Sequence, residues 1–137
     1  MQKAIILPIK GIYVNRILQG QKKYEFRKRL CKNDIDWIYV YETAPVKKVV
    51  CRIEVKAKLM NEKEELWNVT QKYAGIEKEK YDKYFLNQKL GCAYELGKVQ
   101  KLEPQRELME FGINFIPQSY VYLQDEIDDL YSSIFGD

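Results

Sequence analysis

A period of two residues governs the segment from Lys48 to Lys58. Apolar side chains occupy one parity, and charged side chains occupy the other, with Val50 as the exception. Successive side chains of a β-strand point to opposite faces, so this pattern predicts a strand with one face on a core and the other toward solvent. Half-buried strands of this kind favour an antiparallel sheet that wraps a single core.

The rest of the chain supplies further strands and several short helices. Alternating or short apolar runs predict strands at 3–9, 22–28, 36–45, 91–103 and 118–124, and helical spacing predicts helices at 12–20, 61–75, 77–85 and 125–135. About six strands with short flanking helices indicate an α+β fold. A small mixed β-barrel would close such a sheet without long exposed edges.

The length of 137 residues fits one domain, residues 1–137, with one core. The helices around 61–90 are then an insertion between strands. The segment around 125–135 is a C-terminal amphipathic helix, because its apolar residues recur at helical spacing.

Two features of the composition exclude whole classes of chemistry. The chain has no histidine, which removes His-dependent nucleophiles and His-ligated metal sites, so we expect no metal and no cofactor. The three cysteines form no CxxC pair, which argues against a disulfide framework and against a zinc ribbon.

The apolar run at the N-terminus is short and is interrupted by Pro8, so neither a signal peptide nor a membrane span is expected. A cytoplasmic protein without a membrane partner is the simplest interpretation.

Positive charge is concentrated in the first part of the chain. Residues 1–58 contain fourteen of the 23 Lys and Arg but five of the 20 Asp and Glu, a net charge of +9, and the remainder is −6. The basic part is therefore expected to face an anionic partner.

The most basic stretch, residues 20–29, joins a helix to a strand. A glycine at position 20 fits a left-handed helix cap, and period-two alternation follows it. Tyr24 and Phe26 share one side of the strand, and Lys23, Glu25 and Arg27 share the other. The stretch is either a solvated edge strand, whose lysines discourage pairing with other chains, or a site that binds an anion.

Gly20-x-Lys22-x-x-Glu25-x-Arg27 resembles the GxKxxExR signature of the ASCH domain, a branch of the PUA-like β-barrel superfamily. Segments 6–20, 38–55, 91–104 and 116–123 also look like elements of that family, whereas 61–90 and the C-terminal helix match less well. The resemblance implies a cleft between the barrel and the first helix, lined by residues 22–27. It also implies RNA binding or the handling of modified nucleotides.

The leading hypothesis is therefore a module that binds RNA or a modified nucleotide through a basic cleft. Lysine and arginine neutralise phosphates, aromatic rings stack on bases, and small polar side chains bond to base edges. The candidate ligand-binding residues are Gly20, Lys22, Lys23, Glu25, Arg27, Tyr39, Tyr41 and Ser119. For the two tyrosines the alternative is core packing, and for the serine it is satisfaction of a loop.

The competing hypothesis is an enzyme that acts on a free modified nucleoside. Some ASCH proteins resemble a small amidohydrolase that removes an acyl group from N4-acetylcytidine with a lysine, a threonine and a glutamate. Lys22 matches that lysine, and Glu25 stands at the position of the threonine. If the chain is an enzyme, Lys22 and Glu25 are the candidate catalytic residues.

Overall fold

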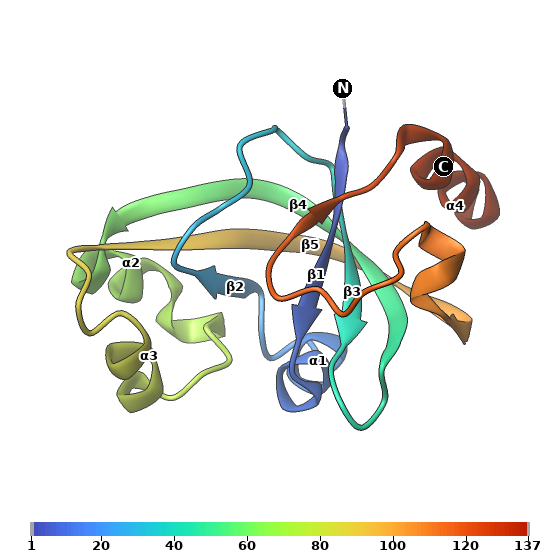
Figure 1. Cartoon of the computed structure of the whole chain (residues 1–137). Helices are drawn as coiled ribbons and strands as arrows, with labels where there is room; N and C mark the ends of the chain where they lie inside the picture. The colour runs from blue at the N-terminus through green and yellow to red at the C-terminus, as the bar shows by residue number, and fades with distance from the viewer. Residues whose placement is uncertain (1, 137) are drawn as a thin grey trace. The chain divides into compact units, whose positions relative to one another are not determined.

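A computed structural model describes residues 2–136. The strands and helices follow one another in the order shown in Figure 1. They are β1 (Ala4–Ile9), α1 (Gly11–Leu18), β2 (Tyr24–Arg27), β3 (Trp37–Glu42), β4 (Lys48–Glu62), α2 (Lys63–Thr70), η1 (Gln71–Tyr73), α3 (Lys78–Tyr84), β5 (Leu90–Arg106), η2 (Leu108–Phe111), β6 (Val121–Tyr122) and α4 (Asp125–Phe135).

The six strands form one mixed sheet in the order β2-β5-β4-β3-β1-β6. This confirms the expected α+β class and the number of strands. Strand β1 pairs with β3 in parallel, so the sheet is not wholly antiparallel as the alternation suggested. Over the described residues the sheet is also open, because β2 and β6 stand at the two ends of the order. Both end strands are very short, which limits the exposed edge without closure into a barrel.

The chain divides into two compact units, each with its own core. Unit 1 comprises Met1–Gly11, Cys31–Glu54 and Lys98–Asp137, and unit 2 comprises Ile12–Leu30 and Val55–Gly97. The long strands β4 and β5 contribute residues to both units. Unit 2 contains fourteen Lys and Arg against eight Asp and Glu, a net charge of +6. Unit 1 contains nine against twelve, a net charge of −3.

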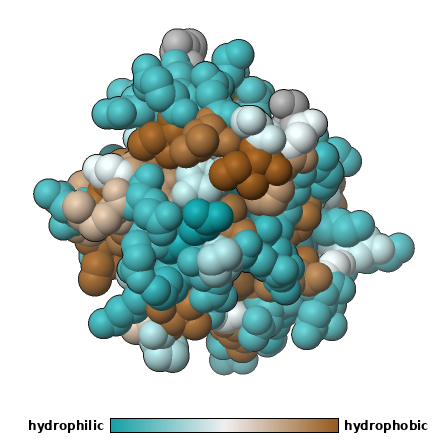
Figure 2. Space-filling view, turned by 90° about the vertical axis from the view of Figure 1, so that its right-hand side faces the viewer, coloured by the Kyte–Doolittle hydropathy of each residue, from teal (hydrophilic) through white to brown (hydrophobic). Residues whose placement is uncertain are grey.

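The core of unit 1 lies between its strands and the C-terminal elements. Its buried members are Ala4, Ile6, Tyr39, Tyr41, Val49, Leu102, Phe111, Ile113, Leu123 and Tyr131. Strands β1 and β3 pair in parallel, in a register that places Ala4 opposite Trp37. Helix α4 contributes Tyr131, whose ring stacks on Phe111 at a centroid distance of 4.8 Å. Figure 2 looks onto the side that carries α4, where hydrophobic side chains gather in the upper part among hydrophilic ones.

The core of unit 2 is built mainly from aromatic side chains. Phe26 of β2 meets Tyr81 of α3 edge to face at 5.0 Å, and Phe85 completes the cluster. Figure 1 shows α2 and α3 below the left-hand ends of β4 and β5, where these helices cover the apolar ring cluster. Strand β2 is thereby fixed at an edge of the sheet by the burial of Phe26.

The alternation that predicted β4 holds only in part. Residues 49–53 are all buried, Arg52 included, and alternation with exposed residues starts beyond them. The exception arises because α4 and the rings around Arg52 cover the second face of the strand in unit 1. The three cysteines, Cys31, Cys51 and Cys92, are free and buried. Burial raises the pKa of the Cys51 thiol to about 12, which keeps it protonated.

Candidate functional site

Lys22 occupies the junction between α1 and β2 in unit 2. The chain leaves α1 through Gly20, whose φ of 78° confirms the predicted left-handed cap. The N–H groups of Gln21 and Lys22 then donate to the carbonyl oxygen of Arg16, at 2.9 and 3.2 Å. This turn directs the Lys22 side chain inward, where only 3% of the residue is exposed.

The ammonium group of Lys22 is enclosed by partners from unit 2. Nζ donates a hydrogen bond of 2.8 Å to the carbonyl oxygen of Ala74, and it lies 3.7 Å from Glu25 Oε1. The ring centres of Tyr13 and Phe26 are 5.2 and 5.1 Å away, within cation–π range. These contacts give Lys22 a structural task, because they tie the end of α1 to the segment after η1.

Burial lowers the pKa of Lys22 from its ordinary value of 10.5. The carboxylate of Glu25 opposes this change, and the cations Arg16 and Arg27 add to it. Desolvation therefore outweighs the nearby carboxylate, and the neutral amine becomes accessible at a lower pH than for a solvated lysine.

Glu25 is buried as well, with 6% of the residue exposed, although the sequence pattern placed it on a charged face. One of its oxygens, Oε2, accepts from Arg27 Nε at 3.2 Å and from Nη2 at 2.8 Å. Two hydrogen bonds from one guanidinium to the carboxylate fix the orientation of the Arg27 guanidinium plane. The Arg27 side chain is 20% exposed, so it is the member of this group that reaches solvent.

The segment 74–77 closes over Lys22, and the sequence did not predict residues 74–76 as part of the site. Arg16 Nη1 donates to the carbonyl oxygen of Gly75 at 2.9 Å, and Nη2 bonds to Glu77 at 3.1 Å. Gly75 has a φ of 64°, and a Cβ atom there would overlap with Lys22 Cβ and stand 2.9 Å from Lys22 Cδ. The sequence predicted Gly75 as the end of a helix. Its contact with Lys22 joins positions 53 residues apart, and a local sequence pattern cannot predict such a contact.

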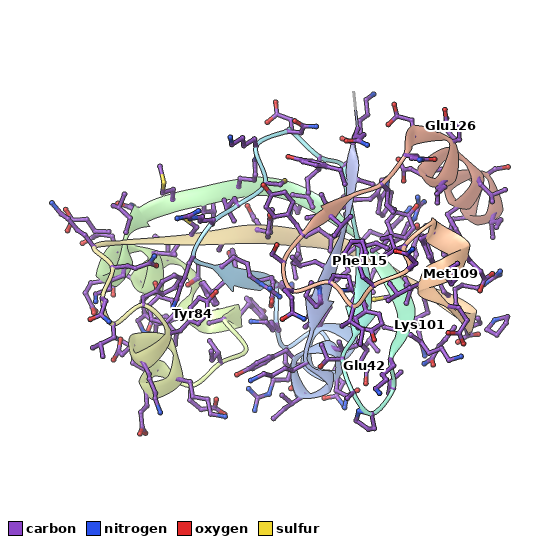
Figure 3. All side chains as sticks on the ribbon, in the orientation of Figure 1. Glu42, Tyr84, Lys101, Met109, Phe115 and Glu126 are labelled. Carbon is purple, nitrogen blue, oxygen red and sulfur yellow. The ribbon has the colours of Figure 1, made fainter. Side chains whose placement is uncertain are left out.

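Two exposed lysines each lie over a tyrosine ring at the ends of β2. Lys23 Nζ is 4.3 Å from the centre of the Tyr73 ring, and Lys28 Nζ is 5.2 Å from that of Tyr84. Figure 3 labels Tyr84 on α3, near β2. Lys23 was a predicted site residue, whereas both tyrosines were missed. Their only sequence signal was a lysine beside each of them, Lys72 and Lys83.

The remaining predicted residues lie in unit 1. Tyr39 and Tyr41 are 0% and 2% exposed and belong to the core, which leaves no ring face open for a base. Ser119 is exposed, in the loop between η2 and β6. The structure thus brings together Gly20, Lys22, Lys23, Glu25 and Arg27 in unit 2, and it assigns the two tyrosines a packing role.

A second buried cation, Arg52, organises unit 1. It is 0% exposed, and its guanidinium lies 3.7 Å from the centre of the Trp37 ring and 4.7 Å from that of Phe135. Its Nε donates to Gln100 at 2.7 Å and its Nη1 to Ser132 Oγ at 2.8 Å. The Trp37 ring therefore stacks on an arginine of its own chain.

Tyr39 connects this cluster to α4 by a second route. Its hydroxyl donates to Asp128 Oδ1 at 2.8 Å, and Arg52 Nη1 donates to the same hydroxyl at 3.4 Å. Burial raises the pKa of the Asp128 carboxyl, although the bond from Tyr39 and the charge of Arg52 act in the opposite direction. Burial also raises the pKa of Tyr39, so its hydroxyl remains a donor.

Residues 2–136 contain no cluster of three or more Cys, Asp or Glu side chains arranged to hold a metal ion. In the same range, no helix has both the length and the apolar character needed to cross a membrane.

No protein-family model matches the sequence. A curated relative, the ASCH domain-containing ribonuclease of Zymomonas mobilis, is 27% identical over 129 residues, which are 91% of this chain and 87% of that protein. The ATP synthase subunit alpha of Ureaplasma parvum is 27% identical over 124 residues, 90% of this chain. The chain spans only 16% of the length of that second relative.

Solved structures of the Z. mobilis ASCH protein match the whole fold. One of them superimposes with a TM-score of 0.85 and 26% identity, over 96% of this chain and 95% of that chain. A variant of it with one tyrosine replaced by phenylalanine gives a TM-score of 0.86 and 25% identity, over 97% and 99% of the two chains. The fold and its basic signature define a small α+β module built on a mixed six-stranded sheet. The matches to the Z. mobilis ASCH structures and to the curated ASCH relative support an ASCH domain in this chain.

Proposed function

We propose that the chain binds RNA through the basic surface of unit 2 around β2. The observation that carries this proposal is the group of Lys22, Glu25 and Arg27, in which two cations share one buried carboxylate. The group keeps an excess positive charge in a place where few water molecules screen it, with Arg27 at the solvent boundary.

Exposed cations extend this charge along the same stretch of chain. Lys23, Lys28 and Arg29 are all exposed, and unit 2 as a whole carries +6. Lysine and arginine side chains of this kind neutralise phosphates and release the counterions of a nucleic acid. The name of the Z. mobilis relative, a ribonuclease, supports RNA as the polyanion.

The amidohydrolase alternative is not favoured. It requires an amine that a free nucleoside can reach, whereas Lys22 is 3% exposed and donates to the carbonyl oxygen of Ala74. The lowered pKa of Lys22 follows from burial and does not by itself indicate a reaction. We therefore assign Lys22 and Glu25 to positioning Arg27 and the segment 74–77.

Fluorescence anisotropy with a labelled single-stranded RNA of mixed sequence tests the proposal. Replacement of Lys23 and Lys28 together by glutamate should weaken binding at least tenfold. It should also reduce the salt dependence of log Kd by about 0.7 for each phosphate that is no longer neutralised. RNA recovered from the binding reaction is then run on a denaturing gel, where intact RNA shows that binding occurs without cleavage.

Lys101→Glu is the control, with one charge reversed where the double variant reverses two, because Lys101 is an exposed lysine of β5 in unit 1 (Figure 3). This variant changes the net charge without touching the surface around β2. Equal affinity of the native protein and the Lys23/Lys28 double variant, or a larger loss in Lys101→Glu, would overturn the proposal.

A further inference from the structure

The two lysine–tyrosine pairs at the ends of β2 are fixed by the backbone of unit 2. The N–H of Lys23 donates to the carbonyl oxygen of Tyr73 at 2.8 Å, and its carbonyl oxygen accepts from the Leu96 N–H at 2.9 Å. At the other end, the N–H of Lys28 donates to Tyr84 Oη at 3.1 Å. The backbone of Tyr73 and the hydroxyl of Tyr84 are thus each bonded to the residue that carries the neighbouring cation, directly before and directly after β2.

Both rings remain open to solvent while the neighbouring aromatic side chains are buried. Tyr73 and Tyr84 are each 36% exposed, whereas Tyr81 and Phe85 are 1% and 0% exposed. The Tyr84 ring rests edge to face against Phe85 at 4.9 Å, so the core supports it from one side. An exposed ring with rigid support is suited to stacking, because little conformational freedom is lost when a base packs on it.

We infer that these pairs, Lys23 with Tyr73 and Lys28 with Tyr84, are two stacking platforms, and that the ligand of this surface is single-stranded RNA. The inference rests on the proposed function and specifies its substrate class. A base that stacks on either ring would displace the ammonium group from the ring face toward the adjacent phosphate, and Lys72, whose Nζ lies 5.6 Å from the centre of the Tyr73 ring, would move with Lys23. A duplex cannot use the rings, because its bases are paired and stacked on one another.

The spacing of the platforms sets a length for the ligand. Lys23 and Lys28 are five positions apart, which is about 16 Å along a fully extended chain. A nucleic-acid strand that keeps a stacked rise of about 3.4 Å per nucleotide covers that distance in about five nucleotides. An RNA strand that is stretched beyond its stacked rise covers the same distance with fewer nucleotides. Oligonucleotides of two residues should therefore reach one platform only, and those of six or more should reach both.

The experiment measures Kd for single-stranded RNA of two, four, six and eight nucleotides, with the native protein and with Tyr73→Ala and Tyr84→Ala. Affinity should rise steeply between two and six nucleotides and then level off. Each alanine variant should bind the octamer at least about fivefold more weakly, the lower end of what removal of a base–aromatic stack costs. A duplex of the same sequence should compete poorly.

Tyr73→Phe and Tyr84→Phe are the matched controls, because they keep the ring and remove only the hydroxyl. Both should bind the octamer within twofold of the native protein, even though Tyr84→Phe loses the acceptor for the Lys28 N–H. If Tyr84→Ala proves unfolded by circular dichroism, Tyr73→Ala decides the question alone, since Tyr73 stands outside the buried ring cluster.

The outcomes separate this inference from the proposed function. If the native protein binds no RNA at all, the proposed function fails. If it binds RNA while duplex competes equally, or while the alanine variants match the phenylalanine variants, the proposed function stands and the two platforms are refuted.

Discussion

Lys22 packs directly against Gly75, which lies 53 positions farther along the chain in unit 2. The glycine lacks the Cβ atom that would collide with the lysine stem, and its carbonyl oxygen accepts from Arg16. Its positive φ is a second reason for glycine, since other residues adopt it at a cost of about 1–2 kcal/mol. Backbone conformation and packing therefore both require glycine at position 75.

Gly75→Ala should lower the free energy of unfolding by about 2–4 kcal/mol, because it combines backbone strain with overpacking against Lys22. Gly20→Ala is the matched control. Gly20 has a similar φ of 78° but no atom within 4 Å of an added Cβ, so only the strain of about 1–2 kcal/mol should appear. Urea denaturation of both variants checks the difference, and equal losses would contradict a steric role for Lys22.

Lys22 also predicts a pH dependence of stability. Its folded-state pKa lies below 10.5, so the unfolded chain binds more protons in the interval between the two values. The free energy of unfolding should therefore rise with pH across that interval, and the cost of the buried charge should be present in full below it.

Lys22→Met lacks this titration and keeps the length of the stem. Urea denaturation between pH 7 and 10.5 should show the native protein gaining stability relative to Lys22→Met as pH increases. The titration of all other groups contributes equally to both proteins, so it cancels from the difference between their free energies of unfolding. A constant difference over the whole range would show that burial does not disfavour the charged amine.

At the scale of the elements, helix α4 is attached to unit 1 by a buried arginine. Arg52 touches Ser132 and Phe135 of the last turns, while Tyr39 bonds to Asp128 one turn from the start. The opposite side of the helix is open, with Leu130 57% and Ile134 55% exposed. The polar contacts and the burial of Tyr131 therefore decide how α4 docks.

Arg52→Ala should cost about 3–5 kcal/mol, the usual penalty for breaking a buried charged network. It leaves Gln100 and Ser132 without this donor and a void between Trp37 and Phe135. Amide hydrogen exchange in α4 should accelerate relative to the strands of unit 1. Leu130→Ala, on the exposed side of the same helix, should stay within about 0.5 kcal/mol of the native protein. Similar exchange of α4 in both variants would contradict the attachment by Arg52.

The elements show where sequence patterns suffice and where they fail. Period-two alternation located β2 and β4, and the glycine cap located the end of α1, because these signals are local. The same alternation placed Glu25 and Arg52 toward solvent. Glu25 is buried because Lys22 and Arg27 pair with it, and Arg52 is buried because residues distant in the sequence accept its hydrogen bonds. A pattern of polarity does not contain these pairings.

At the scale of the whole molecule, the two units share strands but differ in charge. The sequence placed the basic excess in its first half, whereas the structure collects it in unit 2, from segments 12–30 and 55–97. The platforms Tyr73 and Tyr84 come from the second of those segments. A linear count of charge therefore identified the kind of partner we propose but not the residues that would contact it.

The sharing of β4 and β5 predicts that the two units unfold in one transition, as a single domain would. Each unit contains one tryptophan, Trp37 in unit 1 and Trp67 in unit 2. In Trp67→Phe, the urea midpoint from tryptophan fluorescence should coincide with the midpoint from circular dichroism. The same coincidence is expected in Trp37→Phe, at a lower midpoint because Arg52 loses its best stacking partner. Separate midpoints within either variant would show independent units.

The contact between Lys22 and Gly75 has an evolutionary consequence. The nearest neighbour of a Cβ atom added at 75 is Lys22 Cβ, which every residue except glycine carries at position 22. Position 75 should therefore stay glycine among descendants of the same ancestor while Lys22 is replaced by other side chains. The lineage can lose the lysine without losing the glycine, but it cannot lose the glycine while position 22 keeps any side chain.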